Sequence, residues 1–129
     1  MMEPAWEDAI KRGDVQIVLE LLGQGIDVDA RDRFGQTALM LAAHAGYREI
    51  VETLVDHCAN LNIIARFGLS ALMLAVVAGH AEVTRLLVKA GADLSLRETG
   101  VQGFADKTVY DLAVERGMLE LSIELRPKP

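Results

Sequence analysis

The side chains that could carry out chemistry are few, and their spacing does not bring them together. The chain has three histidines and a single cysteine. His57 and Cys58 are adjacent near the end of a predicted helix, so their side chains diverge by about 100°. A metal held by one helix needs ligands on one face, such as positions i and i+4. A lone cysteine also excludes an internal disulfide. We therefore predict no metal site and no cofactor.

The candidate nucleophiles are equally isolated. They are Cys58 and the serines Ser70, Ser95 and Ser122. Ser70 directly precedes an apolar run, as Thr37 and Thr108 do elsewhere, and a hydroxyl at that position caps a helix. The sequence contains no Gly-x-Ser-x-Gly, Ser-x-x-Lys or phosphate-binding glycine loop. We predict that the chain is not an enzyme.

Composition narrows the class of protein further. The 129 residues are 51% hydrophobic, which fits one domain with an aliphatic core. Nineteen acidic against thirteen basic residues give a net charge of −6, which argues against a nucleic-acid or anionic-membrane binder. The first residues, MMEPAWEDAIKRGD, do not resemble a signal peptide. The longest apolar run, 71–78, is about ten residues too short to span a membrane. We expect a cytoplasmic location.

A repeat of 33 residues organises the chain. Glycines recur at this spacing at Gly13, Gly46 and Gly79, and so do three sets of apolar residues, of which one is Leu21, Leu54 and Leu87. A fourth copy follows at a spacing of 38, because a loop insertion lengthens the link before it. Each unit predicts two short helices that cannot bury their apolar faces alone, so neighbouring units must stack into a solenoid. The three leucines are expected to be buried alike.

The segments GQTALMLAAHAGYREIVETLVDHCANLN and GLSALMLAVVAGHAEVTRLLVKAGADLS resemble ankyrin repeats. The resemblance covers nearly the whole chain and implies an all-α ankyrin-repeat solenoid in a single domain, 1–129. Its four helix-turn-helix units would span about 5–31, 32–64, 65–97 and 98–126, with hairpin loops and an insertion near 98–104. The first unit would lack its first hairpin, and the last would be a capping repeat. The family's usual Thr-Pro-Leu-His is Thr37-Ala38-Leu39-Met40 here.

The resemblance implies a protein–protein interaction module that uses its concave face and hairpin tips. Mapped by the period, that face is rich in Lys and Arg, although the whole chain is acidic. We therefore expect a protein partner with an acidic and apolar patch, and no nucleic acid or membrane. The predicted partner-binding residues, called the contact surface below, are Arg31, Arg33, Phe34, Gln36, His44, Ile64, Arg66, Phe67, Leu69, Val77 and Arg97.

Several alternatives stay open at this level. Phe34 and Phe67 hold the same place in successive hairpins, where each ring would either contact a partner or pack on its neighbour about 10 Å away. The same Phe/Arg stripe (Arg33, Phe34, Arg66, Phe67 and Leu69) would also serve self-association, so the chain is a monomer or a weak homo-oligomer. The insertion is either functional or neutral. His80 is expected to make a structural hydrogen bond.

Overall fold

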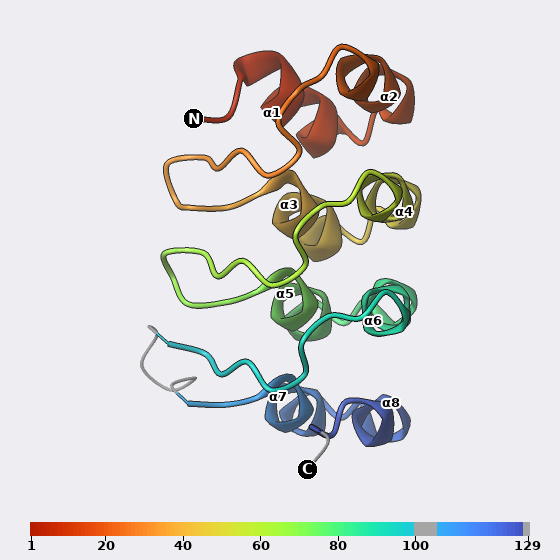
Figure 1. Ribbon diagram of the computed structural model, residues 1–129. Coiled ribbons are helices and arrows are strands. Elements are labelled where there is room, and N and C mark those ends of the chain that lie inside the picture. Colours follow the sequence, from red (N-terminus) through yellow and green to blue (C-terminus); the bar gives the residue numbers. More distant parts are fainter. Residues whose placement is uncertain (100–105, 128–129) are drawn as a thin grey trace.

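The computed structural model describes residues 1–99 and 106–127, which form eight helices and no strand. The helices come in four antiparallel pairs: α1 (Pro4–Arg12) with α2 (Val15–Gly23), α3 (Ala38–Ala45) with α4 (Arg48–Asp56), α5 (Ala71–Val77) with α6 (Ala81–Lys89), and α7 (Val109–Glu115) with α8 (Leu119–Glu124). Figure 1 shows the pairs stacked one on another. The predicted all-α solenoid is confirmed. None of these helices is long and apolar enough to cross a bilayer.

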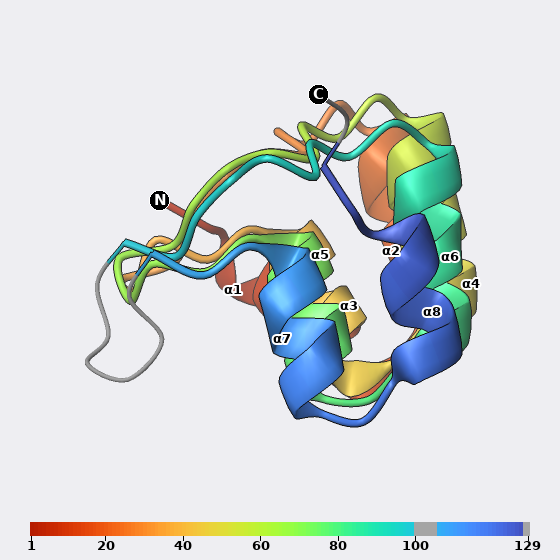
Figure 2. The ribbon, with the colours of Figure 1, turned by 90° about the horizontal axis from the view of Figure 1, so that it is seen from below.

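The stack has two helical layers and a row of hairpins. The odd-numbered inner helices form one layer and the even-numbered outer helices the other (Figure 1). Seen from the end of the stack, the links between units project beyond the inner helices, on the side away from the outer helices (Figure 2). Most of the insertion predicted near 98–104 lies outside the described residues.

The inner helices α3, α5 and α7 begin at the predicted caps. The Thr37 hydroxyl accepts a hydrogen bond from the Met40 amide, and the Ser70 hydroxyl accepts one from the Met73 amide, both at 3.3 Å. At Thr108 the cap is reciprocal, because the Asp111 carboxylate also accepts from the Thr108 amide. These side chains satisfy amides that the first helical turn leaves unpaired. Ser70 is therefore a structural residue, as its position predicts.

Burial at equivalent positions shows which neighbour each side chain meets. Ala43 and Val76 are fully buried, but their counterpart Val114 in the last unit is 40% exposed, so this position faces the following unit. Conversely, Leu54 is fully buried while Leu21 in the first unit is only partly buried. The expectation that Leu21 is buried like its counterparts was wrong, because none of the described helices packs on this side of the first pair as α2 packs on α4.

Adjacent units are also joined by hydrogen bonds at one repeated position, the residue before each outer helix. The Tyr47 hydroxyl donates to the carbonyl oxygen of Lys11 at 3.2 Å. One repeat later, His80 Nε2 lies 3.0 Å from the carbonyl oxygen of His44. Gly46, which ends α3 with φ of +77°, lies against the His80 ring, where an added Cβ would stand 2.7 Å from ring atoms. The structural role expected for His80 is confirmed.

Leu54→Ala is expected to lower the free energy of unfolding by roughly 2–5 kcal/mol, because it empties a fully buried site. Leu21→Ala removes the same atoms from the partly buried end unit and should cost about half as much or less. Urea denaturation of both variants measures the difference. Equal losses would contradict the assignment of this position to the contact with the preceding unit.

Gly46→Ala is expected to cost at least about 1 kcal/mol more than Gly79→Ala. Both glycines have positive φ, so both substitutions carry the left-handed backbone penalty of about 1–2 kcal/mol. The added methyl group at Gly46 also displaces the His80 ring and so breaks the hydrogen bond of His80 to His44. The methyl group at Gly79 enters open space. Thermal melts of the two variants provide the comparison, and equal melting temperatures would show that this contact does not matter.

Candidate functional site

The first hairpin tip is held rigid by a single carboxylate. Asp32 Oδ1 accepts hydrogen bonds from the amides of Phe34 and Gln36, each at 2.9 Å. Its Oδ2 accepts from the Gln36 side-chain amide at 3.2 Å. Gly35 completes the turn with a φ of +75°. Asp32 therefore serves the turn, although it lies between two arginines in the sequence.

Neighbouring hairpins are bonded to one another along the stack. The Arg66 amide donates to the carbonyl oxygen of Phe34 at 2.9 Å, which joins the first tip to the second. The Thr99 amide donates to the carbonyl oxygen of Gly68 at 3.3 Å, which joins the second tip to the third. Nearer the outer helices, Asp29 accepts a hydrogen bond from the Asn60 amide at 2.9 Å. The hairpins therefore form a continuous row (Figure 1).

The residues of the predicted contact surface fall into an exposed group and a partly buried group. Six members are exposed: Arg31, Arg33, Phe34, His44, Arg66 and Arg97. Five are partly buried: Gln36, Ile64, Phe67, Leu69 and Val77. The exposed group is mainly arginine at the hairpins, and most of the partly buried group packs against the core.

Phe34 and Phe67 are not equivalent, despite their matched places in the sequence. Phe34 is 49% exposed, with the Arg33 guanidinium 4.9 Å from its ring centroid, an arrangement in which the cation is attracted to the π face. Phe67 is partly buried against the core. Of the stripe, the structure thus brings Arg33, Phe34 and Arg66 together at adjoining tips.

The cations on the helices and the arginines on the hairpins differ in whether they form ion pairs. Most cations on the helices pair with carboxylates, as in Lys11–Glu7, Arg12–Asp8, Arg48–Glu52, Arg48–Glu82 and Arg85–Glu124. The hydrogen bond that Arg48 donates to Glu52 is the main cause that raises the pKa of Arg48. Within 1–99 and 106–127, no carboxylate lies in salt-bridge range of the hairpin arginines Arg31, Arg33, Arg66 and Arg97. Arg97 instead donates to the carbonyl oxygen of Asp106 at 2.7 Å.

A cleft that sequence reasoning missed adjoins the exposed ring. It has a volume of about 280 Å³ and is lined by Met1, Met2, Glu7, Lys11, Asp32, Arg33 and Phe34. The Met2 amide donates to the carbonyl oxygen of Arg31 at 2.8 Å, and the Met2 side chain is buried. The first residues are thereby fastened beside the first hairpin. Nothing in the repeat pattern signals this contact, because these residues precede the repeats.

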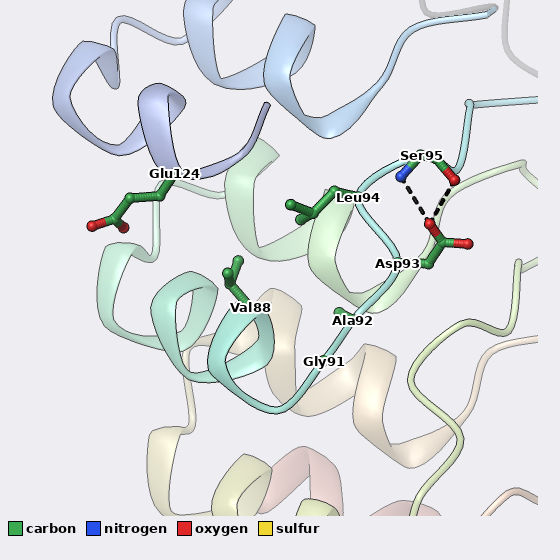
Figure 3. A pocket seen from close by; sticks show the side chains of 7 residues that line it. All are labelled: Val88, Gly91, Ala92, Asp93, Leu94, Ser95 and Glu124. Atoms are coloured by element: carbon green, nitrogen blue, oxygen red, sulfur yellow. Dashed lines mark hydrogen bonds between the residues drawn. The ribbon is translucent and has the colours of Figure 1, made fainter. Parts of the chain in front are cut away.

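A second cleft, of about 430 Å³, lies between the third link and α8 (Figure 3). Its polar residues are Asp93, Ser95 and Glu124. The Ser95 hydroxyl and amide donate to Asp93 at 2.6 and 2.8 Å, and these hydrogen bonds lower the pKa of the Asp93 carboxyl. Glu124 is paired with Arg85. The Asp93–Ser95 pair stabilises a turn, and the cleft contains no histidine or lysine to act as a base for Ser95.

The remaining candidate metal ligands lie apart. His57 Nδ1 is 2.8 Å from the carbonyl oxygen of Thr53, and Cys58 is an exposed free thiol. Cys58 has a φ of +63° where the equivalent residues are Gly25 and Gly91. Among the described residues, no three His, Cys, Asp or Glu side chains gather into a possible metal site.

Comparison with known proteins decides the family. Residues 7–98 match the family model "Ankyrin repeats (3 copies)". The chain belongs to the ankyrin repeat family. Ankyrin repeats are generally protein–protein interaction modules, and the family is typically non-catalytic.

Among the similar curated proteins are ankyrin repeat, SAM and basic leucine zipper domain-containing proteins 1. The protein from Carollia perspicillata is 44% identical over 57 residues, and that from Callithrix jacchus is 48% identical over 56. The matches cover 44% and 43% of this chain. They cover only 12% of each relative, so the match spans a small part of these proteins' length.

Replacing the two rings separates their contributions to stability. Phe34→Ala is expected to cost about 1 kcal/mol or less, because half of the ring already faces solvent. Phe67→Ala should cost roughly 2–3 kcal/mol, because its ring packs against the core. The two variants remove identical atoms, so melting temperature and urea midpoint compare them directly. A larger loss for Phe34→Ala would contradict the assignment.

Proposed function

We propose that this ankyrin-repeat chain is a non-catalytic module that binds a protein partner with an acidic and apolar patch. The partner would lie on the hairpin tips and on the concave side of the inner helices, against the contact surface. The observation that carries the proposal is the row of hairpin arginines without a carboxylate partner in the described residues, beside helices whose cations are mostly paired.

The free arginines suit intermolecular recognition for an energetic reason. A guanidinium already held by a carboxylate must lose that partner before it can bind another, whereas Arg33 and Arg66 have no such bond to break. Arg is enriched among residues that contribute most to binding, as are large aromatic side chains that fill pockets. Phe34, exposed beside a cleft, supplies the apolar component.

Other members of the contact surface would contribute shape more than charge. His44 is exposed at the end of α3, and Val77 is partly exposed at the equivalent position of the α5 end. Ile64 and Leu69 flank the second tip and are partly buried. These side chains would exclude water around the arginines, since charge pairs contribute more when they are shielded from solvent.

A reducing, cytoplasmic location is part of the proposal. Its support is the exposed thiol of Cys58, the only cysteine of the chain. Structural disulfides are typical of oxidising compartments, and this chain has no second cysteine to form one. Fractionation of cells that express the tagged chain tests the location. Recovery of the tagged chain outside the cytoplasm would contradict this part.

The double variant Arg33→Glu, Arg66→Glu is expected to reduce association with the partner at least tenfold and to make the residual binding less salt-dependent. Reversed charges slow the encounter with an acidic partner. The matched control is Arg85→Glu, Lys89→Glu, which makes the same charge change on α6, on the outer layer. Affinity purification with both variants, followed by titration of the recovered protein, measures the effect.

An equal loss of partner binding in both double variants would contradict the proposed surface, because the loss would then depend on net charge alone. Sedimentation of the purified chain at several concentrations tests self-association through the same stripe. A mass that rises with concentration for the native chain and not for Arg33→Glu, Arg66→Glu would identify a second copy as the partner. A constant monomer mass would leave a different protein as the partner.

A further inference from the structure

We propose that the cleft between the third link and α8 binds an extended, neutral segment of a partner protein with the pattern apolar–Asn–apolar. The backbone amide of the Asn donates to the hydroxyl oxygen of Ser95, and the apolar side chains cover the wall of the cleft. This cleft shares no residue with the contact surface, so the inference goes beyond the proposed function and does not rest on it.

The three links that follow the outer helices α2, α4 and α6 contain the same turn. In each turn a backbone amide donates to a side-chain oxygen two residues earlier, at 2.8–3.0 Å. The pairs are Asp29 with Asp27, Asn62 with Asn60, and Ser95 with Asp93. Asp and Asn side chains favour this turn because they reach the amide two residues on. The links therefore share one local structure, and their contacts can be compared.

The last residue of each turn faces the link of the following unit. Asp29 accepts a hydrogen bond from the Asn60 amide at 2.9 Å, and Asn62 accepts one from the Asp93 amide at 2.8 Å. Ser95 holds the same place in the third link. Its hydroxyl proton is donated to Asp93 at 2.6 Å, which leaves the lone pairs of its oxygen as acceptors. No residue in the described part of the chain donates to that oxygen.

The third link lies open because the helix beside it is short. Helix α6 continues to Lys89, whose counterpart at the spacing of 38 is Pro127. The residue before a proline disfavours the helical backbone, and α8 ends at Glu124. The chain then turns toward α7, where the Arg126 guanidinium lies 5.4 Å from the centroid of the Tyr110 ring. Residues 125–127 do not line the cleft, which therefore marks the place that a fourth link would take.

The two existing contacts between links indicate which segment suits this place. The donor of the second link lies between Ala59, which is buried, and Leu61, which packs against the core. The donor of the third link lies between Ala92 and Leu94, which are buried and packed in the same way. The open cleft presents Val88, Ala92 and Leu94 as its apolar wall (Figure 3). Its volume of about 430 Å³ lies within the range of ligand clefts.

The charges of the cleft favour a neutral occupant. Hydrogen bonds from Ser95 lower the pKa of the Asp93 carboxyl, so this group is ionised at neutral pH. Glu124 is the second carboxylate of the wall and is paired with Arg85. No lysine or arginine is among the residues described as lining the cleft, so an acidic side chain has no partner there. The cleft thus suits amide donors, and Asn at the centre of the segment avoids the like-charge repulsion that Asp would meet.

Titration of the isotope-labelled chain with the peptide acetyl-Gly-Ala-Asn-Leu-Asn-amide, followed by NMR, tests the proposal. The peptide copies residues 58–62 of the second link, with glycine in place of Cys58. One comparison peptide carries a methyl group on the amide nitrogen of its central Asn, and another has serine in place of leucine. Amide chemical shifts report both the affinity and the place of binding.

We expect shift changes at residues 88–95 and at least about fivefold weaker binding of the methylated peptide, because it lacks the donor. The serine peptide should also bind more weakly, because it covers less of the apolar wall. Ser95→Ala should weaken the parent peptide about threefold or more. Ser95→Asn, which supplies the acceptor of the second link, should retain it. Circular dichroism of each variant checks that the fold is retained.

Equal affinities of the methylated and parent peptides, or shift changes only outside residues 88–95, overturn the proposed site. So does an affinity of Ser95→Asn as low as that of Ser95→Ala, or no binding at several millimolar peptide. The same shift changes on concentrating the chain alone would assign the cleft to a second copy in place of a partner. Arg33→Glu, Arg66→Glu should leave peptide binding unchanged, so failure here and failure of the proposed function are separate results.

Discussion

The packing of each helix pair on its neighbours is the contact on which the rest of the structure depends. A single pair of helices of six to nine residues cannot bury its apolar side chains by itself. Ala43 and Val76 are fully buried because another unit covers them, and Val114 is exposed at the position where none does. The hydrogen bonds of Tyr47 and His80 to preceding units reinforce the same contact. Contacts between units therefore stabilise the fold more than contacts within a single unit do.

Stacking also builds the surface that the proposal assigns to a partner. Each hairpin is a short turn with little core of its own, yet the amides of Arg66 and Thr99 bond to the preceding tips. These bonds hold successive tips at the period of the stack, so Arg33 and Arg66 are presented from equivalent places of adjoining hairpins. The helices carry their charges differently, in pairs such as Arg48–Glu52 that neutralise each other locally. The proposed binding surface and the helix stack thus use largely separate sets of charged residues.

The sequence predicts the structural features that recur with the 33-residue period. It does not predict features that depend on the end of the stack or on local packing. The 33-residue recurrence was enough for the helix pairs and for the caps at Thr37 and Ser70, and the family resemblance was enough for the role of His80. Leu21 was misjudged because burial depends on a neighbour that an end unit lacks. The difference between Phe34 and Phe67 depends on local packing, which two identical Arg-Phe-Gly sequences cannot reveal. Whether an arginine has a carboxylate partner also depends on contacts between units, which the period does not specify.

The central claim is that stacking holds the hairpin tips in one rigid row, and native-state hydrogen exchange of the Arg66 amide tests it most directly. This amide belongs to an exposed residue, yet it donates to Phe34 of the neighbouring unit. We predict slow exchange, and faster exchange in step with the loss of global stability when urea is added, because opening this bond requires the units to separate. Exchange at the rate of a freely exposed loop amide, insensitive to low urea, would contradict the account.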